Sequence, residues 1–118
     1  MTKKENLKID IKEREGVSLV KFEGRLDLYN SPLLKSTINM MIAQKKESVI
    51  IDFSELFYID SSGIGSLISS MQDFEQKGGV IKFVGINKTI KRTLSIMNAD
   101  DMFDMYDTEE DARYSLPD

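Results

Sequence analysis

The stretch 49-VIIDFSELFYIDSSGIGSL-67 joins two patterns of apolar residues. The run at 48–53 is short, β-branched and nearly continuous, which is typical of a strand covered on both faces. From Ile64 onward apolar residues return at helical intervals until Gly78 and Gly79, which suit the positive φ angles of a helix end. The sequence therefore predicts a central strand, a strand exit before residue 60, and a helix over about 61–77.

On the amino-terminal side, apolar and polar residues alternate at 7–12 and again at 20–24. This period predicts a hairpin of two half-buried strands. Ser31 then supplies an N-cap and Pro32 a proline at the first helical position, so a first helix is expected to run to about Gln44.

Toward the carboxyl terminus, residues 80–84 read as another strand, and a third helix with Met97 on its core stripe is closed by Asn98. Weaker signals predict an edge strand within 102–106 and a short helix that starts near 108–113, with acidic residues in its first turn. Strands that alternate with helices imply an α/β layer structure. We expect one domain over residues 1–118, with its sheet and helices between about 6 and 115.

Composition excludes several classes of function. A net charge of −4 and a pI near 4.9 argue against binding to nucleic acid, which depends on clustered basic residues. No apolar run approaches the roughly 20 residues that cross a bilayer, so no direct membrane contact is expected. The amino terminus carries no apolar stretch typical of a secretory signal, and a cytoplasmic location is the expectation.

The chain contains neither cysteine nor histidine. Thiolate catalysis, thiolate metal sites and the usual base of a serine hydrolase are therefore absent. GIGSLI lacks the third glycine of a dinucleotide fingerprint, and no GxxxxGK or GxSxG motif appears. A phospho-aspartate at Asp60 would need paired acidic ligands that Asp10 alone does not supply. We expect no enzyme activity, no cofactor and no metal.

The start of the second predicted helix is the strongest candidate site. Asp60 or Ser61 can cap its first turn. Ser62, Ser66, Ser69 and Asp73 fall on the stripe opposite the apolar one, which is expected to be exposed, and its small side chains form a surface suited to docking. Ser62 lies at a helix amino terminus, where a phosphate is tolerated by the dipole and the free N–H groups. Serine caps are common, so the residues alone favour a simple capped helix.

The segment 60-DSSGIGSL-67, placed after VIIDFSELFYI and before a helix that ends at Gly78, resembles the STAS domain of bacterial anti-sigma factor antagonists. The resemblance extends to 24-GRLD-27 and to 92-RTL-94 running into 98-NADDMF-103. It implies a single STAS domain of the α/β class, with a mixed sheet of four to five strands and about four helices packed mainly on one face.

The resemblance also implies a switch. Ser62, with Ser61 as the second candidate, would accept phosphate from a partner serine kinase of the GHKL type that is itself the anti-sigma factor. The unphosphorylated protein would bind this kinase and free the sigma factor, and a PP2C-type phosphatase would restore it. The implied partner-binding residues, of which Asp27 and Asn30 also read as turn and cap residues, are Asp27, Leu28, Tyr29, Asn30, Asp60, Ser61, Ser62, Gly63, Ser66 and Ser69.

A second function keeps the fold and changes the partner. Domains similar to STAS also occur in stress-signalling assemblies, in anion transporters and in lipid-transport complexes. Transporter domains are normally fused to membrane spans, which this sequence lacks. The alternative is therefore a STAS subunit of a stress-signalling or lipid-transport complex that acts by protein binding.

Overall fold

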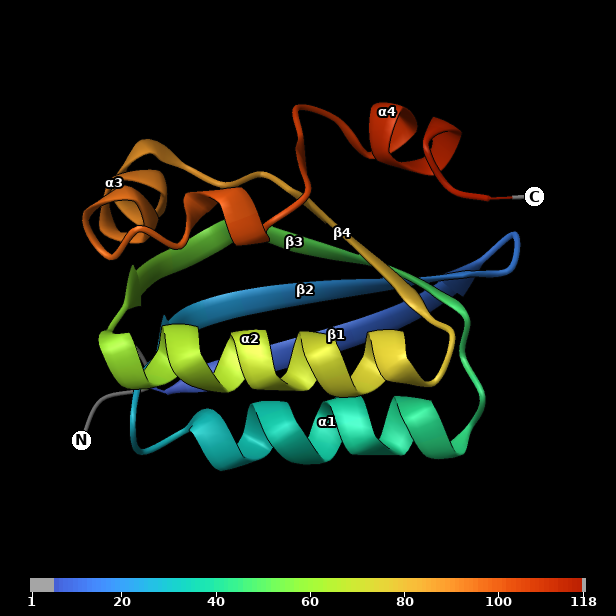
Figure 1. The fold of residues 1–118 in the computed structure, drawn as a ribbon, viewed down its shortest axis with the longest axis horizontal. Helices are drawn as coiled ribbons and strands as arrows, with labels where there is room; N and C mark the ends of the chain where they lie inside the picture. Colours follow the sequence, from blue (N-terminus) through green and yellow to red (C-terminus); the bar gives the residue numbers. More distant parts are fainter. Residues whose placement is uncertain (1–5, 118) are drawn as a thin grey trace.

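A five-stranded sheet with helices packed against it forms the framework of the computed structural model, which describes residues 6–117 (Figure 1). In chain order the elements are β1 (Leu7–Arg14), β2 (Val17–Leu26), α1 (Ser31–Ala43), β3 (Ser48–Ile59), α2 (Ser61–Gln76), β4 (Val80–Val84), α3 (Lys88–Ile96), the 3₁₀ turn η2 (Asp100–Met102), β5 (Met105–Tyr106) and α4 (Glu109–Tyr114).

The strands lie in the order β1-β2-β3-β4-β5, which places β3 at the centre. β1 and β2 are antiparallel, and every other neighbouring pair is parallel, so the sheet is mixed. β1 and β2 form the predicted hairpin. Its two-residue loop has φ of 52° at Glu15 and 79° at Gly16, the left-handed conformation that matches the twist of the two strands.

One face of the sheet carries the main core. α1 and α2 pack side by side against it, and α3 closes the same core beside β3 (Figure 1). A row of four phenylalanine rings crosses this face from β2 to the residue that follows η2, with successive ring centroids 5.4, 5.5 and 5.0 Å apart. The row consists of Phe22, Phe53, Phe83 and Phe103.

The opposite face is mostly open. α4 covers one end of it, where Ala112 packs against Val17, Ile50 and Val84 (Figure 1). The prediction of a mixed sheet of four to five strands, with about four helices mainly on one face, is therefore confirmed.

β3 is twice as long as the apolar run that predicted it. Its pairing with β2 shifts by one residue between Lys21 and Glu23, and again between Gly24 and Arg25. At each shift β3 contains an extra residue, so its core positions after Phe53 follow at intervals of three rather than two. Because these core positions are three residues apart, the second half of β3 does not show the alternating pattern by which a strand is recognised in a sequence. The buried positions are Leu56 and Ile59.

Three smaller expectations are wrong. Asn30, not Ser31, is the N-cap of α1, because Ser31 is buried and already helical. Met97 is exposed, because α3 ends at Ile96 and the core stripe continues at Ala99 instead. Of the edge strand expected within 102–106, only β5 is extended, because η2 occupies the residues before it.

Within residues 6–117, no helix combines the length and the apolar character that a membrane crossing requires.

Candidate functional site

The junction between β3 and α2 is a capped turn. Asp60 is the N-cap residue of α2, and its Oδ1 accepts a hydrogen bond from the Gly63 N–H at 2.7 Å. The Asp60 N–H donates to the Leu26 carbonyl at 3.3 Å, which ties the junction to the end of β2. Asp60, rather than Ser61, therefore caps the helix, as one of the two sequence alternatives proposed.

Gly63 is buried against the chain itself. A Cβ at this position would lie 3.0 Å from the carbonyl carbon of Leu26 and 3.1 Å from Cγ1 of Ile59, and closer still to the Leu26 oxygen. The sequence suggested that glycine here lets another backbone approach closely. The approaching backbone is the end of β2 in the same chain, so Gly63 fixes the helix start and contributes no exposed side to a docking surface.

Ser61 and Ser62 are exposed in the first turn of α2. Within the described part of the chain, neither hydroxyl has a hydrogen-bond partner, because Asp60 already supplies the cap. Both hydroxyls are thus available for contact with another molecule. The prediction that Ser62 is accessible at a helix amino terminus is confirmed.

Farther along α2 the predicted stripe is less open than expected. Asp73 is exposed, but Ser66 and Ser69 are only half-buried positions. A serine side chain is short, so longer neighbours three and four residues away cover part of it. In the half of α2 nearest β3, the exposed positions are therefore those of the first turn, together with Gly65.

The loop between β2 and α1 is held rigid by two of its own side chains. Asp27 Oδ1 accepts from the Tyr29 and Asn30 N–H groups at 3.0 and 3.2 Å. Asn30 Oδ1 accepts from the Asp27 N–H at 2.8 Å, and its amide donates to the Arg25 carbonyl at 2.6 Å. Ser31 donates its hydroxyl to the Asp27 carbonyl at 2.6 Å. Asp27 and Asn30 thus shape the loop, as their turn and cap character indicated.

Four apolar or aromatic side chains project from this end of the sheet. Leu28 and Tyr29 are 62% and 88% exposed at the tip of the loop, and Phe57 and Tyr58 are 50% and 39% exposed near the end of β3. The sequence analysis named the first two and missed the others. The second register shift on β3 falls between the pairs Gly24–Leu56 and Arg25–Tyr58 and leaves Phe57 without a partner on β2.

Arg25 is the cation of this region. Its guanidinium lies 4.0 Å from the centroid of the Tyr58 ring, and its Nε is 3.6 Å from Asp27 Oδ2. The arginine therefore partly neutralises Asp27 while it stacks on an exposed aromatic ring. The sequence analysis assigned Arg25 no role at the site. Its position near the end of β2, two residues before Asp27, could have indicated one.

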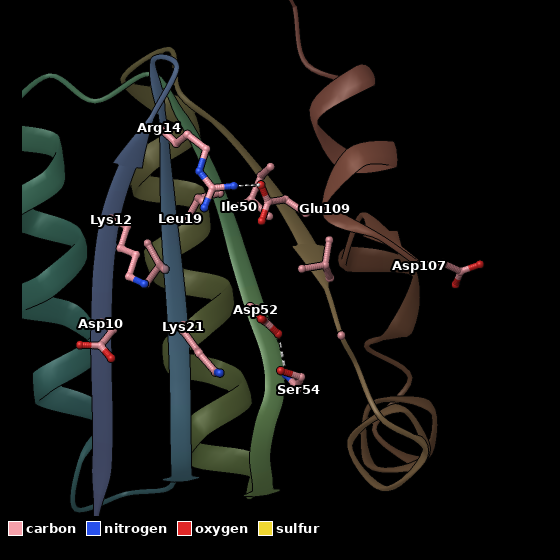
Figure 2. Close-up of a pocket in the computed structure, with 13 residues that line it drawn as sticks. Asp10, Lys12, Arg14, Leu19, Lys21, Ile50, Asp52, Ser54, Asp107 and Glu109 are labelled. Carbon is pink, nitrogen blue, oxygen red and sulfur yellow. Dashed lines mark hydrogen bonds and ion pairs between the residues drawn. The ribbon is translucent and has the colours of Figure 1, made fainter.

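Ser62 lies outside the cavity on the open face of the sheet. A cavity of about 470 Å³ is present on the open face of the sheet, away from α2, and Ser62 is not among the residues that line it (Figure 2). Among the described residues, no group of three acidic side chains is placed to hold a metal ion. The exposed first turn of α2 and the exposed apolar side chains at the same end of the sheet are features suited to contact with a protein surface.

Comparison with known proteins gives a consistent match. The STAS domain family model matches residues 8–112. The anti-sigma F factor antagonist of Paenibacillus polymyxa is 27% identical over 112 residues, which cover 94% of this chain and 96% of that protein. The crystal structure of an anti-sigma factor antagonist from Mycobacterium paratuberculosis superposes with a TM-score of 0.83 at 23% identity and covers 97% of both chains.

The phosphorylated form of the Bacillus cell fate determinant SpoIIAA superposes with a TM-score of 0.68 at 21% identity, over 93% of this chain and all of that one. Both structural matches extend over the sheet and helices described above. Because the family model spans nearly the whole described chain, this protein belongs to the STAS domain family.

Proposed function

We propose that this protein is an anti-sigma factor antagonist that binds an anti-sigma factor and thereby frees a sigma factor. The observation that carries the proposal is an exposed Ser62 in the first turn of a capped helix, at the end of the sheet where Leu28, Tyr29, Phe57 and Tyr58 are also exposed. The names of its relatives, which are anti-sigma factor antagonists, support the same function. These properties favour a binding protein over an enzyme.

Phosphorylation of Ser62 is the proposed control. A phosphate adds about −1.5 to −2 charges at neutral pH. The first turn of α2 offers free N–H groups and the positive end of the helix dipole, so the helix tolerates the new charge. Asp60 keeps its cap on the Gly63 N–H, since that hydrogen bond does not involve Ser62. The phosphate therefore acts on the docking surface while α2 stays folded.

The energy required of the phosphate is moderate. A change from about 99% bound to about 1% bound requires roughly 5.5 kcal/mol. A doubly charged group within an apolar contact has to be desolvated, and the half-buried carboxylates of Asp60 and Asp27 repel it. Arg25 is already engaged by Asp27 and Tyr58, so it is not free to neutralise the phosphate.

A GHKL-type serine kinase, which is also the anti-sigma factor, is the partner that this proposal requires. A PP2C-type phosphatase would return Ser62 to its hydroxyl form. In this scheme the protein is the substrate of both enzymes. Its own contribution is the surface formed by the loop at 27–30 and the start of α2. The structural relative SpoIIAA has been solved in a phosphorylated form, which supports a phosphate-controlled switch.

The test is affinity capture from a native lysate with the wild type, Ser62→Ala and Ser62→Asp as baits. Mass spectrometry would identify the retained proteins and the phosphorylated residue. We expect the wild type and Ser62→Ala to retain a GHKL-type kinase, and Ser62→Asp to retain much less of it, because the aspartate places a negative charge in the contact. Ser115→Asp is the matched control, because Ser115 is an exposed serine beyond α4 and should leave capture unchanged. Failure of both the wild type and Ser62→Ala to retain such a kinase contradicts the proposal.

A further inference from the structure

Within residues 6–117, no strand pairs with the outer edge of β1. β1 is the first strand in the sheet order, and β2 is its partner (Figure 2). The opposite edge of the sheet is β5, which has only two residues. An edge of eight residues carries a row of backbone N–H and C=O groups that can pair with another strand.

The hairpin loop fixes which backbone groups point outward. In a hairpin with a two-residue loop, the residues that flank the loop exchange hydrogen bonds, and here these are Arg14 and Val17. Residues of β1 at even positions therefore direct their backbone groups toward β2. The bond from the Arg25 N–H to the Asn6 carbonyl, 3.3 Å long, agrees with this alternation. The outward-facing backbone groups belong to Leu7, Ile9, Ile11 and Glu13.

The side chains of β1 are complementary to a second copy of themselves. In an antiparallel pair of β1 strands with a two-fold axis at Ile9, Lys8 of each copy lies opposite Asp10 of the other on the open face of the sheet. On the face that carries the helices, Leu7 lies opposite Ile11, and Ile9 lies opposite itself. Opposite charges and apolar pairs that face one another across strands both stabilise a sheet.

Neighbouring alignments lack this match. An axis at Asp10 sets that carboxylate against itself and Lys8 against Lys12. An axis at Lys8 sets two ammonium groups against each other. An axis at Ile11 pairs Asp10 with Lys12 but sets Lys8 against Arg14. Each of these alignments places like charges directly opposite, which is destabilising.

The flank of α1 nearest this edge continues the apolar surface. α2 packs against α1 and β4, so α1 lies on the side of the sheet that β1 borders. Ile42 faces α2, since it lines a cavity together with Phe74. At 100° per residue, Leu33 and Met40 fall on the opposite flank of α1, and each is 43% exposed. Two apolar side chains thus remain uncovered beside the open strand.

We propose that the protein forms a symmetric homodimer through the edge of β1, with the two-fold axis at Ile9 and the Leu33 and Met40 flanks of α1 facing each other across it. The two sheets then form one continuous sheet, and Ile9 and Ile11, half-buried in one copy, become covered. The strand edge supplies the backbone hydrogen bonds, and the charge pattern sets the register.

This inference does not rest on the proposed function. α2 lies over the sheet beyond α1, so Ser62 and the dimer edge are separate surfaces. A dimer therefore presents two copies of the site, and a partner that is itself dimeric is bound with a gain in apparent affinity.

The test is sedimentation equilibrium of the full chain at increasing concentration. We expect the wild type to rise from 13.5 kDa toward twice that mass. Lys8→Asp opposes two carboxylates, and Asp10→Lys opposes two ammonium groups, so each variant alone should lose the concentration-dependent doubling. An equimolar mixture of the two variants should regain it, because each Lys or Asp then meets its opposite charge.

Lys12→Asp is the matched control, because this lysine lies outside the charge pairs of the Ile9 register and its variant should associate like the wild type. Association in the mixture also demonstrates that both single variants are folded. A wild type that stays at 13.5 kDa up to millimolar concentration overturns the proposal. So does a mixture that fails to associate, or a Lys12→Asp variant that stays monomeric.

Discussion

At Gly63 the fold accepts a hydrogen atom on Cα and nothing larger. The end of β2 and the side chain of Ile59 fill the space that a methyl group would need. Two residues later, Gly65 has nothing within 4 Å of the same position. The two glycines of one helix turn therefore play different roles, and a pair of matched substitutions separates them.

We predict that Gly63→Ala lowers the free energy of unfolding by about 1–3 kcal/mol, because the added methyl group forces α2 away from β2. Gly65→Ala is expected to raise it by about 0.5–1 kcal/mol, because alanine favours the helix. Urea unfolding followed by circular dichroism measures both changes. Equal effects of the two substitutions would contradict the role assigned to Gly63.

Residue identities predicted much of the site, but not all of its contacts. The cap at Asp60 and the exposure of Ser62 follow from local rules about helix starts and helical phase. The burial of Gly63 does not, because it depends on where β2 ends, about 37 positions earlier in the chain. Such a contact between distant segments leaves no pattern in the neighbouring sequence.

β5 is a strand of only two residues, so its backbone pairing alone holds it weakly in the sheet. Its two residues pair with Phe83 and Val84 of β4. The Lys82 ammonium donates a hydrogen bond to the Asp104 carboxylate, just before β5, and lies 5.5 Å from the centroid of the Tyr106 ring. The ion pair thus attaches β5 and the segment that leads to α4 to the edge of the parallel strands.

The hydrogen bond to Asp104 raises the pKa of Lys82 above its ordinary value of 10.5, and partial burial opposes this rise. A raised folded-state pKa stabilises the fold fully below the unfolded value, and the contribution is lost as pH rises through the folded value. We predict that Asp104→Asn lowers the free energy of unfolding by about 0.2–1 kcal/mol near neutral pH. The difference from the wild type should shrink above about pH 10.5.

Chemical unfolding at several pH values measures this difference. Asp101→Asn is the control, since Asp101 is exposed and forms no ion pair with another described residue. If the effect of Asp104→Asn were the same at neutral and alkaline pH, the ion pair would not be its cause.

Element types were easier to predict than element limits. The apolar patterns of α2 and β4 gave their bounds to within a residue, because α2 packs one regular face inward and β4 is a short apolar run covered on both faces. β3 continued to Ile59 instead of ending at Phe53, because its two extra residues interrupt the alternation while pairing with β2 continues. Bulges of this kind are set by the neighbouring strand, which the local sequence does not contain.

α4 is joined to the β1–β2 hairpin across the open face of the sheet. Arg113 of α4 donates to the Arg14 carbonyl at 3.1 Å and to Glu109 Oε2 at 3.0 Å, and its guanidinium lies 3.8 Å from Glu15. Arg14 reaches Glu109 at 3.5 Å (Figure 2). α4 is thereby fastened to the hairpin loop, and Ala112 stays packed on Ile50.

We predict that Arg113→Ala lowers the free energy of unfolding by about 1 kcal/mol through the loss of these hydrogen bonds. It should also increase amide hydrogen exchange in α4 more than in β3, because α4 loses its attachment while the main core does not change. Tyr114→Ala is the control, as Tyr114 is 94% exposed. Uniform loss of protection across the whole chain would show that α4 is not a separable unit.

In the loop at 27–30, two residues make internal hydrogen bonds and the two between them are exposed. Asp27 and Asn30 make the hydrogen bonds that set its shape, while Leu28 and Tyr29 point outward. The outer pair can therefore change identity during evolution at little expense to folding. Under the proposed function, duplicated copies of such a gene that diverge at these two positions would come to recognise different partners.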